Sequence, residues 1–324
     1  MLYPLKFSPI FKEKIWGGSK IKTVLKQDFF PLSNCGEAWT ISGIDPESSI
    51  VSNGFLKGNT LNELIEIYMD DLVGGKIFNE FGYEFPLLIK FIDAEKDLSV
   101  QVHPDDTMAE QKHRCNGKTE MWYVIDAERD SKLNIGFNAP MNKQLLKKHI
   151  DKDTIEDVLH YLPVQAGDAV FIPSGKVHAI GKGILLAEIQ QSSDITYRLY
   201  DYNRPGETGN LRPLHIQDAL DAIHYHSTDN ALISYSKQPN TANNMVSTPF
   251  FTTHFMDLNT SIEKTYTDID SFVIYICPFG EAKISCPDAE ETIRIGECVL
   301  LPAMLDSVII APNPQCKLLE TYIE

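Results

Sequence analysis

The sequence predicts a mostly β fold, a β-sandwich or β-barrel decorated by a few helices. Short apolar segments typical of strands outnumber helical segments along the 324 residues. The regular alternation of strand and helix that marks parallel α/β sheets is absent from the pattern. The spacing G-x5-P occurs at residues 167–173 and again at residues 296–302. Together these observations favour a β-barrel that has been duplicated.

The strands are expected where apolar and β-branched residues gather between turn signals. In chain order these segments are LLIKFIDA (87–94), LSVQVH (98–103), MWYVID (121–126), AVFIP (169–173), GILLAEIQ (183–190), TYRLYDY (196–202), FVIYIC (272–277) and CVLLPA (298–303).

Three segments are expected as helices. The first follows Thr60, which forms a capping box with Glu63, and it ends at a pair of glycines. The second covers residues 141–160 as two short helices. The third is entered through Pro213, since proline suits the first turn of a helix.

The second G-x5-P segment is expected to belong to a barrel without a metal. An apolar aromatic strand precedes each copy, but Asp306 and Ser307 stand near the position that corresponds to His178. We therefore expect a catalytic domain with helical decoration at 1–236 and a C-terminal barrel at 237–324. The polar stretch 237–249 is the expected linker.

Composition excludes several classes of partner. The formal net charge of -16 argues against nucleic acid and anionic membranes. No run approaches the roughly 18 apolar residues of a membrane span. The first 18 residues carry scattered charges, and the six cysteines show no CxxC spacing, so a cytoplasmic protein with reduced thiols is expected. An anionic substrate would need local cations, for which Lys90, Lys118 and Arg198 are candidates.

The tightest motif is GDAVFIPSGKVHAI at residues 167–180. Gly167 lets the chain turn into a strand, since glycine tolerates positive φ. Pro173 ends that strand because it has no N–H. His178 then stands on the next strand, where a neutral imidazole can bind a metal.

Two further segments offer ligands that can meet His178. In SVQVHPDD (99–106), Gln101 and His103 are two positions apart and point to one face of a strand. In GKTEMWYVID (117–126), Lys118 and Glu120 have the same spacing. Two imidazoles and a carboxylate form a ligand set that zinc accepts at a catalytic site. Iron, manganese and nickel accept it too, so ligand type leaves the metal open.

The chain resembles the type I phosphomannose isomerases (mannose-6-phosphate isomerases), in the short bacterial form that lacks an inserted helical domain. The segments that carry the resemblance are WGG (16–18), GEAWTISG (36–43), LLIKFIDAEKDLSVQVHPDD (87–106), GKTEMWYV (117–124), IPSGKVHAI (172–180), EIQQSSDITYRLYDYNR (188–204) and LRPLHIQDAL (211–220). The motif at 167–180 alone would indicate only the cupin superfamily. The resemblance implies two cupin-type β-barrels (jelly rolls), one catalytic Zn²⁺ and a sugar phosphate as the small-molecule partner.

The resemblance also implies roles for single residues. They fall on Gln101, His103, Glu120 and His178 as metal ligands, on Lys90 and Ser99 as substrate-binding residues for the phosphate, and on Arg198 and Lys118 as catalytic residues. Gln101 replaces the first histidine of the usual cupin HxH and can act as a ligand or orient water. Glu120 follows much later than in most cupins. The isomerase family shares both departures.

The implied reaction interconverts mannose 6-phosphate and fructose 6-phosphate through a cis-enediol. A proton leaves C2 of the open aldose and returns to C1, and a Lewis-acidic metal with Arg198 would stabilise the oxyanion. Lys90 and Ser99 would position the phosphate. Water at the metal, Lys118, Asp194 and a histidine are all candidates for the base.

Three other functions fit parts of the pattern. A cupin isomerase acting on glucose 6-phosphate would use the same ligands. An iron cupin oxygenase would show two histidines and a carboxylate at shorter spacing. A non-catalytic sugar-phosphate sensor would be free to lose a metal ligand or Arg198, whereas here every expected position is filled.

Overall fold

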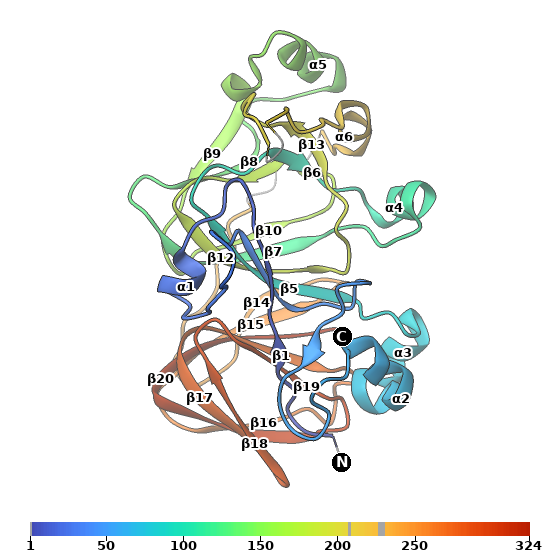
Figure 1. The fold of residues 1–324 in the computed structure, drawn as a ribbon, viewed down its shortest axis with the longest axis vertical. Helices are drawn as coiled ribbons and strands as arrows, with labels where there is room; N and C mark the ends of the chain where they lie inside the picture. The colour runs from blue at the N-terminus through green and yellow to red at the C-terminus, as the bar shows by residue number, and fades with distance from the viewer. Residues whose placement is uncertain (1, 207–208, 226–230) are drawn as a thin grey trace.

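The computed structural model describes residues 2–206, 209–225 and 231–324, and its regular structure is mostly β, as expected (Figure 1). The strands are β1 (Phe7–Ser8), β2 (Ile10–Lys12), β3 (Glu37–Ile41), β4 (Ile50–Val51), β5 (Leu87–Ala94), β6 (Val100–Val102), β7 (Glu120–Ala127), β8 (Lys132–Phe137), β9 (Leu159–Pro163), β10 (Ala169–Ile172), β11 (His178–Ile180), β12 (Ile184–Gln191), β13 (Tyr197–Tyr200), β14 (Asn243–Ser247), β15 (Thr252–Leu258), β16 (Ile262–Thr265), β17 (Val273–Cys286), β18 (Ala289–Arg294), β19 (Cys298–Leu301) and β20 (Ser307–Tyr322). The helices are α1 (Lys20–Thr23), α2 (Leu61–Val73), α3 (Gly75–Phe81), α4 (Asp106–His113), α5 (Lys143–Asp151), the 3-10 helix η1 (Ile155–Val158) and α6 (Ile216–Ala222).

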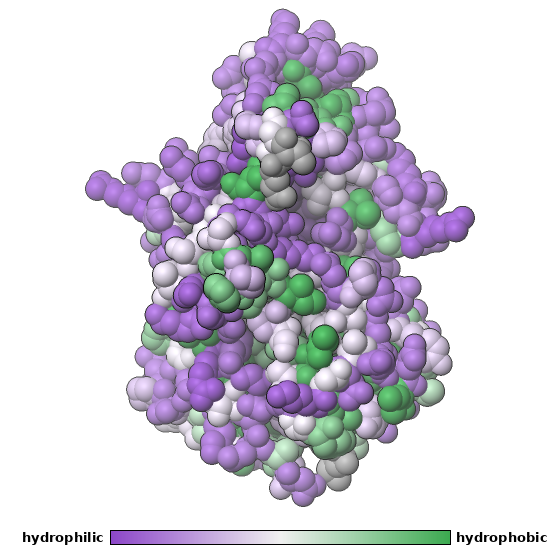
Figure 2. Space-filling view, viewed as in Figure 1, coloured by the Kyte–Doolittle hydropathy of each residue, from purple (hydrophilic) through white to green (hydrophobic). Residues whose placement is uncertain are grey.

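Polar side chains dominate the face of the molecule seen in Figure 2, where apolar side chains form only scattered groups. Such a surface agrees with the net charge of -16. None of the described helices is long and apolar enough to cross a membrane.

A six-stranded antiparallel sheet lies at the centre of the molecule (Figure 1). Its strand order is β10-β7-β12-β5-β3-β2. β5 and β12 pair along their whole length, and every residue of both strands is buried. Burial on both faces explains why these two strands have nearly continuous apolar sequences rather than alternating ones.

One face of the central sheet closes the first barrel. The even-numbered side chains of β5, β7, β10 and β12 point toward a five-stranded sheet of order β13-β6-β11-β8-β9. Ile92, Trp122 and Leu186 pack there against Leu133 and Ile135 of the opposite sheet. The helices α5 and α6 cover the outer face of the five-stranded sheet.

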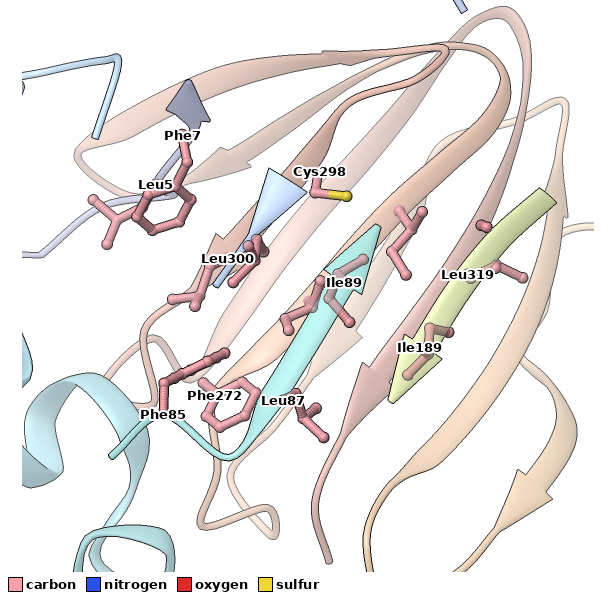
Figure 3. Packing of buried hydrophobic residues seen from close by; sticks show 14 of the residues in the cluster. Leu5, Phe7, Phe85, Leu87, Ile89, Ile189, Phe272, Cys298, Leu300 and Leu319 are labelled. Atoms are coloured by element: carbon pink, nitrogen blue, oxygen red, sulfur yellow. The ribbon is translucent and has the colours of Figure 1, made fainter. Parts of the chain in front are cut away.

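The other face of the central sheet packs on the C-terminal barrel. This barrel is one seven-stranded sheet. Five strands follow the order β14-β15-β20-β17-β18, β16 pairs with β20, and β19 pairs with β17. Ile89 and Ile189 of the central sheet meet Leu300 and Leu319 of the C-terminal sheet (Figure 3). The backbone N–H of Leu5 donates a hydrogen bond to the carbonyl of Leu300 at 2.8 Å, and the N–H of Leu300 donates one to the carbonyl of Leu5 at 2.9 Å. One hydrophobic core therefore joins the two barrels, and a boundary near residue 236 stays a proposal.

The two barrels match residue by residue in register. Val170, three residues after Gly167, pairs with Trp122, and Val299, three residues after Gly296, pairs with Tyr275. The central strands continue the match, because Glu188 pairs with Trp122 as Glu320 pairs with Tyr275. The spacing G-x5-P thus marks equivalent strands in both copies.

Two of the four candidate metal ligands of the first copy, Glu120 and His178, have an apolar and a hydroxyl counterpart in the second. Glu120 stands two residues before Trp122, and the corresponding residue before Tyr275 is Val273. His178 corresponds by the same count to Ser307. These two positions of the second copy therefore carry neither the carboxylate nor the imidazole of the first, and a metal-free second barrel stays a prediction.

Helix prediction was partly right. The capping box of Thr60 and Glu63 forms at the start of α2, and residues 141–160 hold α5 and η1. α6 begins at Ile216, so Pro213 lies before the helix instead of in its first turn. The expected linker 237–249 contains β14 and is therefore not purely a linker. The helices α1, α3 and α4 were not expected.

We expect Gly296→Ala to destabilise the protein more than Gly167→Ala, although both glycines have a positive φ, of 81° and 88°. The backbone strain of an L-residue there should cost about 1 kcal/mol in either case. A Cβ at Gly296 would also lie 2.7 Å from Cβ of Leu25, whereas a Cβ at Gly167 meets only Nζ of Lys237, at 3.5 Å. Urea denaturation of both variants measures the difference, and equal losses of unfolding free energy would contradict the steric argument.

Candidate active site and metal centre

The strand registers bring the expected ligands together inside the first barrel. Gln101 of β6 lies opposite both His178 of β11 and Arg198 of β13. Glu120, the first residue of β7, reaches His178 from the central sheet. Ligand atoms of His103, Glu120 and His178 all lie within 4.8 Å of one another. Among the described residues, these three form the group whose ligand atoms lie close enough together to hold one metal ion.

Each imidazole is held by a backbone carbonyl. Nδ1 of His103 donates to the carbonyl of Ile195, and Nδ1 of His178 donates to the carbonyl of Lys176, both at 2.9 Å. Because a carbonyl only accepts, Nδ1 carries the proton and Nε2 keeps its lone pair. Both Nε2 atoms face Glu120, at 3.5 Å from Oε2 for His103 and 3.4 Å from Oε1 for His178. Carbonyls commonly fix metal-ligating histidines in this tautomer.

Except for Nε2 of His178, which lies 3.2 Å from Nε2 of Gln101, the facing atoms lack hydrogen bonds that would compensate their burial. Nε2 of His103 and both carboxylate oxygens of Glu120 are buried without a hydrogen bond of acceptable geometry to the described residues. Burial lowers the pKa of His178 to about 4 and holds the pKa of His103 well below its usual range, so both rings are neutral at pH 7. Burial, with the nearby Glu188 carboxylate, raises the pKa of Glu120 to about 7. Converging lone pairs of two neutral imidazoles and a carboxyl group fit a divalent metal ion.

Gln101 lies on the more exposed side of this group. Its Nε2 is 3.2 Å from Nε2 of His178, and its side chain is only half-buried, whereas His103, Glu120 and His178 are at most 1% exposed. Rotation of the amide by half a turn would present Oε1 to the same point. The position suits both roles expected for Gln101, as a ligand and as a residue that orients water.

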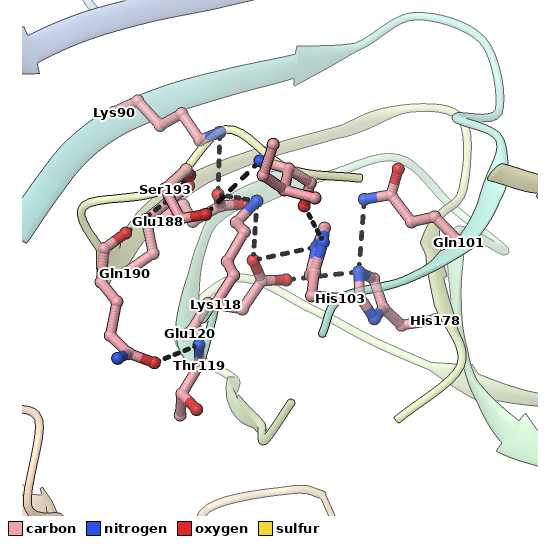
Figure 4. Close-up of polar contacts among 12 residues, drawn as sticks. Lys90, Gln101, His103, Lys118, Thr119, Glu120, His178, Glu188, Gln190 and Ser193 are labelled. Carbon is pink, nitrogen blue, oxygen red and sulfur yellow. Dashed lines mark hydrogen bonds and ion pairs between the residues drawn. The ribbon is translucent and has the colours of Figure 1, made fainter. Parts of the chain in front are cut away.

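A line of alternating charges runs from Glu120 along the barrel interior (Figure 4). Nζ of Lys118 lies 3.0 Å from Oε2 of Glu120 and 3.4 Å from Oε1 of Glu188. Nζ of Lys90 lies 3.0 Å from the same Glu188 oxygen. Oε2 of Glu188 accepts a hydrogen bond from Nε1 of Trp122 at 2.9 Å. All four charged groups are buried, so each depends on its neighbours for compensation.

Lys90 is held as a cation from two sides. Burial alone would lower the pKa of Lys90, but the carboxylates of Glu188 and Glu37 raise it above its ordinary value. Burial alone would raise the pKa of Glu37. The positive charges of Lys90 and Lys14 outweigh this effect and lower the pKa of Glu37 to about 2. Glu37 also accepts a hydrogen bond from Nε1 of Trp39 at 2.8 Å.

Ser99 and Arg198 contact each other instead of Lys90. Nε of Arg198 donates to Oγ of Ser99 at 3.3 Å, and its Nη1 donates to the carbonyl of Pro213 at 2.9 Å. Ser99 is buried, and Arg198 is half-buried, on the same side of the barrel as Gln101. Lys90 and Ser99, expected together as phosphate ligands, thus take part in two different sets of contacts.

Two polar residues outside the expected set hold the segment that carries Lys118 and Glu120. Oδ1 of Asp106 accepts from N of Gly117 at 2.8 Å and from Nε2 of Gln191 at 2.9 Å. Oε1 of Gln191 in turn accepts from N of Thr119 at 2.8 Å. These bonds fix the backbone immediately before Glu120.

Glu188 was also outside the expected set, although the sequence carries a signal for it. It is the lone carboxylate in the apolar run GILLAEIQ, just as Lys90 is the lone cation in LLIKFI. A charge in a strand buried on both faces needs a partner. The pairing of β5 with β12 places Glu188 directly opposite Lys90.

Comparison with known proteins gives a consistent result. The family model for the catalytic domain of phosphomannose isomerase type I matches residues 4–135. The mannose-6-phosphate isomerase of Streptococcus mutans is 36% identical over 308 residues, which cover 95% of either chain. The mannose-6-phosphate isomerase ManA of Bacillus subtilis is 43% identical over 225 residues, 68% of either chain. The crystal structure of a mannose 6-phosphate isomerase from Bacillus subtilis superposes with a TM-score of 0.89 at 33% identity, covering 99% of this chain and 100% of that one. Since the similarity in sequence spans nearly the whole length and the fold is the same, the chain belongs to the phosphomannose isomerase type I family.

Proposed function

We propose that the chain is a metal-dependent aldose–ketose isomerase that interconverts mannose 6-phosphate and fructose 6-phosphate through a cis-enediol. The observation that carries the proposal is the convergence of His103, Glu120 and His178 beside buried lysines, in a chain of this family. A carbon acid as weak as C2–H of an aldose needs charge stabilisation, and this site gathers it. The catalytic domain would be residues 1–236, residues 237–324 would form the metal-free barrel, and the cytoplasm is the proposed location.

The proposed metal is Zn²⁺, with His103, Glu120 and His178 as ligands and Gln101 completing the set. When bound, it would supply Lewis-acid stabilisation of the negative charge that develops on the sugar oxygens. Imidazole nitrogen and carboxylate oxygen are ligand atoms that zinc accepts at catalytic sites.

Protein groups would divide the remaining tasks. Arg198 would present fixed donors to O1 and O2, because a guanidinium stays charged and rigid. Lys118, held between two carboxylates, would either transfer a proton to and from the same oxygens or stabilise their negative charge by its own positive charge. Lys90 and Ser99 would position the phosphate, so that remote binding energy aligns the reacting end. The proton taken from C2 returns to C1, and a proton moves between O1 and O2 to balance the step.

Chelation tests the proposal. Isomerase activity on mannose 6-phosphate, measured as fructose 6-phosphate formed, should be lost after EDTA treatment and should return with Zn²⁺. Glucose 6-phosphate assayed in parallel separates the two sugar specificities. Purified protein that binds zinc but converts neither sugar phosphate would contradict the isomerase and favour a sensor, whereas conversion of glucose 6-phosphate alone would change the substrate.

A further inference from the structure

Gln190 is a fully buried amide on the face of β12 that lines the first barrel. It follows Glu188 by two positions, so both side chains point to the same face of the strand. Across the ladder Gln190 pairs with Glu120. Its exposed fraction is 0%. The register therefore places Gln190 on the same face as Glu188 and opposite the proposed metal ligand Glu120, in the part of the barrel shown in Figure 4.

The hydrogen bonds of Gln190 determine which end of the amide is which. Its Nε2 donates to the carbonyl of Gln191 at 2.8 Å and to the carbonyl of Ser193 at 2.6 Å. Since carbonyls only accept, the nitrogen must lie on that side. Oε1 is then turned away from both carbonyls, and it is buried without a hydrogen-bond partner among the described residues.

An unsatisfied buried oxygen of this kind calls for an explanation. Leaving a buried acceptor without a donor is unfavourable, and native proteins do so rarely. In the described residues, such atoms gather in this barrel, where Oε1 of Gln190 joins Nε2 of His103 and Oε1 of Glu120, while Oε2 of Glu120 and Oε1 of Glu188 each face a lysine ammonium group at 3.0 Å. His103 and Glu120 are proposed metal ligands, and Glu120 is the residue opposite Gln190 on the neighbouring strand.

The chemistry of the amide narrows what it can bind. Oε1 only accepts hydrogen bonds, so it cannot bind the phosphate or the carbonyl oxygen of an open sugar, which are acceptors themselves. The donors on an open hexose phosphate are its hydroxyl groups. We propose that Oε1 of Gln190, opposite the proposed metal ligand Glu120, accepts a hydrogen bond from the 3- or 4-hydroxyl of the sugar chain, next to the reacting C1–C2 end, and so positions the acyclic substrate. This inference rests on the proposed function and adds a substrate-binding residue to it.

The test combines a variant with altered substrates. Gln190→Met keeps the length and most of the volume of the side chain but removes the acceptor. The kcat/KM of the wild-type enzyme and of the variant is measured with mannose 6-phosphate and with its 3-deoxy and 4-deoxy analogues. On the parent substrate the variant should be about ten-fold slower, as expected for one hydrogen bond. On one of the two deoxy analogues the two enzymes should be equal. The same ratio on all three compounds would overturn the proposal.

Asn62 supplies a matched control. Its Nδ2 donates to the carbonyl of Gly43 at 3.1 Å and to Oδ1 of Asp45 at 3.0 Å, and its Oδ1 is also buried without a partner. Asn62 lies on α2, outside the first barrel, so Asn62→Leu should leave all three kcat/KM values unchanged. A wild-type enzyme inactive on mannose 6-phosphate would defeat the proposed function instead.

A second measurement does not depend on the folding of a variant. In a crystal structure of the wild-type protein with bound mannose 6-phosphate, Oε1 of Gln190 should lie within hydrogen-bond distance of a sugar hydroxyl. A water molecule in that place, with the sugar elsewhere in the barrel, would overturn the proposal.

Discussion

Glu120→Gln should abolish tight metal binding and lower kcat/KM on mannose 6-phosphate by roughly a thousand-fold, the equivalent of about 4 kcal/mol. The substitution keeps the shape of the side chain but removes the negative charge that faces both Nε2 atoms. A neutral amide is a weak ligand, and His103 with His178 alone would leave the ion short of donors. Metal content by elemental analysis and steady-state kinetics measure the two effects separately.

Glu110→Gln is the control for this substitution. Glu110 is exposed on α4, and the same chemical change there should leave metal content and activity at the wild-type level. A Glu120→Gln protein that retains a full equivalent of metal would remove Glu120 from the proposed ligand set. Full metal loss with activity unchanged would instead refute the catalytic role of the metal.

Glu188→Gln should lower the free energy of unfolding at pH 7 by about 3–5 kcal/mol, the cost typical of removing one partner from a buried ion pair. The reason is that Glu188 compensates two cations at once, with Lys90 at 3.0 Å and Lys118 at 3.4 Å. Removing its charge leaves two buried ammonium groups close to each other. Urea denaturation followed by fluorescence measures the loss.

Lys90→Met provides the comparison, because each of the two carboxylates that Lys90 compensates, Glu188 and Glu37, keeps another lysine as partner. Glu188 would still face Lys118, and its Oε2 would keep the hydrogen bond from Trp122. We therefore expect a smaller loss of unfolding free energy than in Glu188→Gln. If the two losses were equal, the argument that Glu188 serves two cations would be wrong.

Strands with continuous apolar sequences were predicted well, whereas β8, β9, β15, β18 and β20 were not expected. The run at 87–94 coincides with β5, since a strand buried on both faces is apolar throughout. The two-residue alternation placed Gln101 and His103 on the inner face of β6, and Val100 with Val102 packs on the outer side. The convergence of His103, Glu120 and His178 was expected from strand alternation and resemblance, and the structure shows it.

What the sequence pattern missed depends on long-range contacts or on weak periodicity. α4 buries only Ala109, so its sequence shows no apolar stripe that would indicate a helix. Its beginning was also interpreted as the end of the segment SVQVHPDD (99–106). Asp105 nevertheless caps that helix, accepting from N of Met108 at 2.8 Å. The role of Glu188 follows from the register of β12 on β5 and β7, which only the folded chain reveals.

The core shared by the two barrels has a consequence for synthesis of the chain. The side chains of Ile89 and Ile189 are covered by Leu300 and Leu319, which the ribosome adds more than a hundred residues after Ile189. A nascent chain that already contains every residue of the first barrel therefore still exposes one apolar face of its central sheet. Such a face is a typical binding surface for chaperones and a site of aggregation. Translation of the last strands, which complete this core, thus ends the interval in which the new protein needs protection.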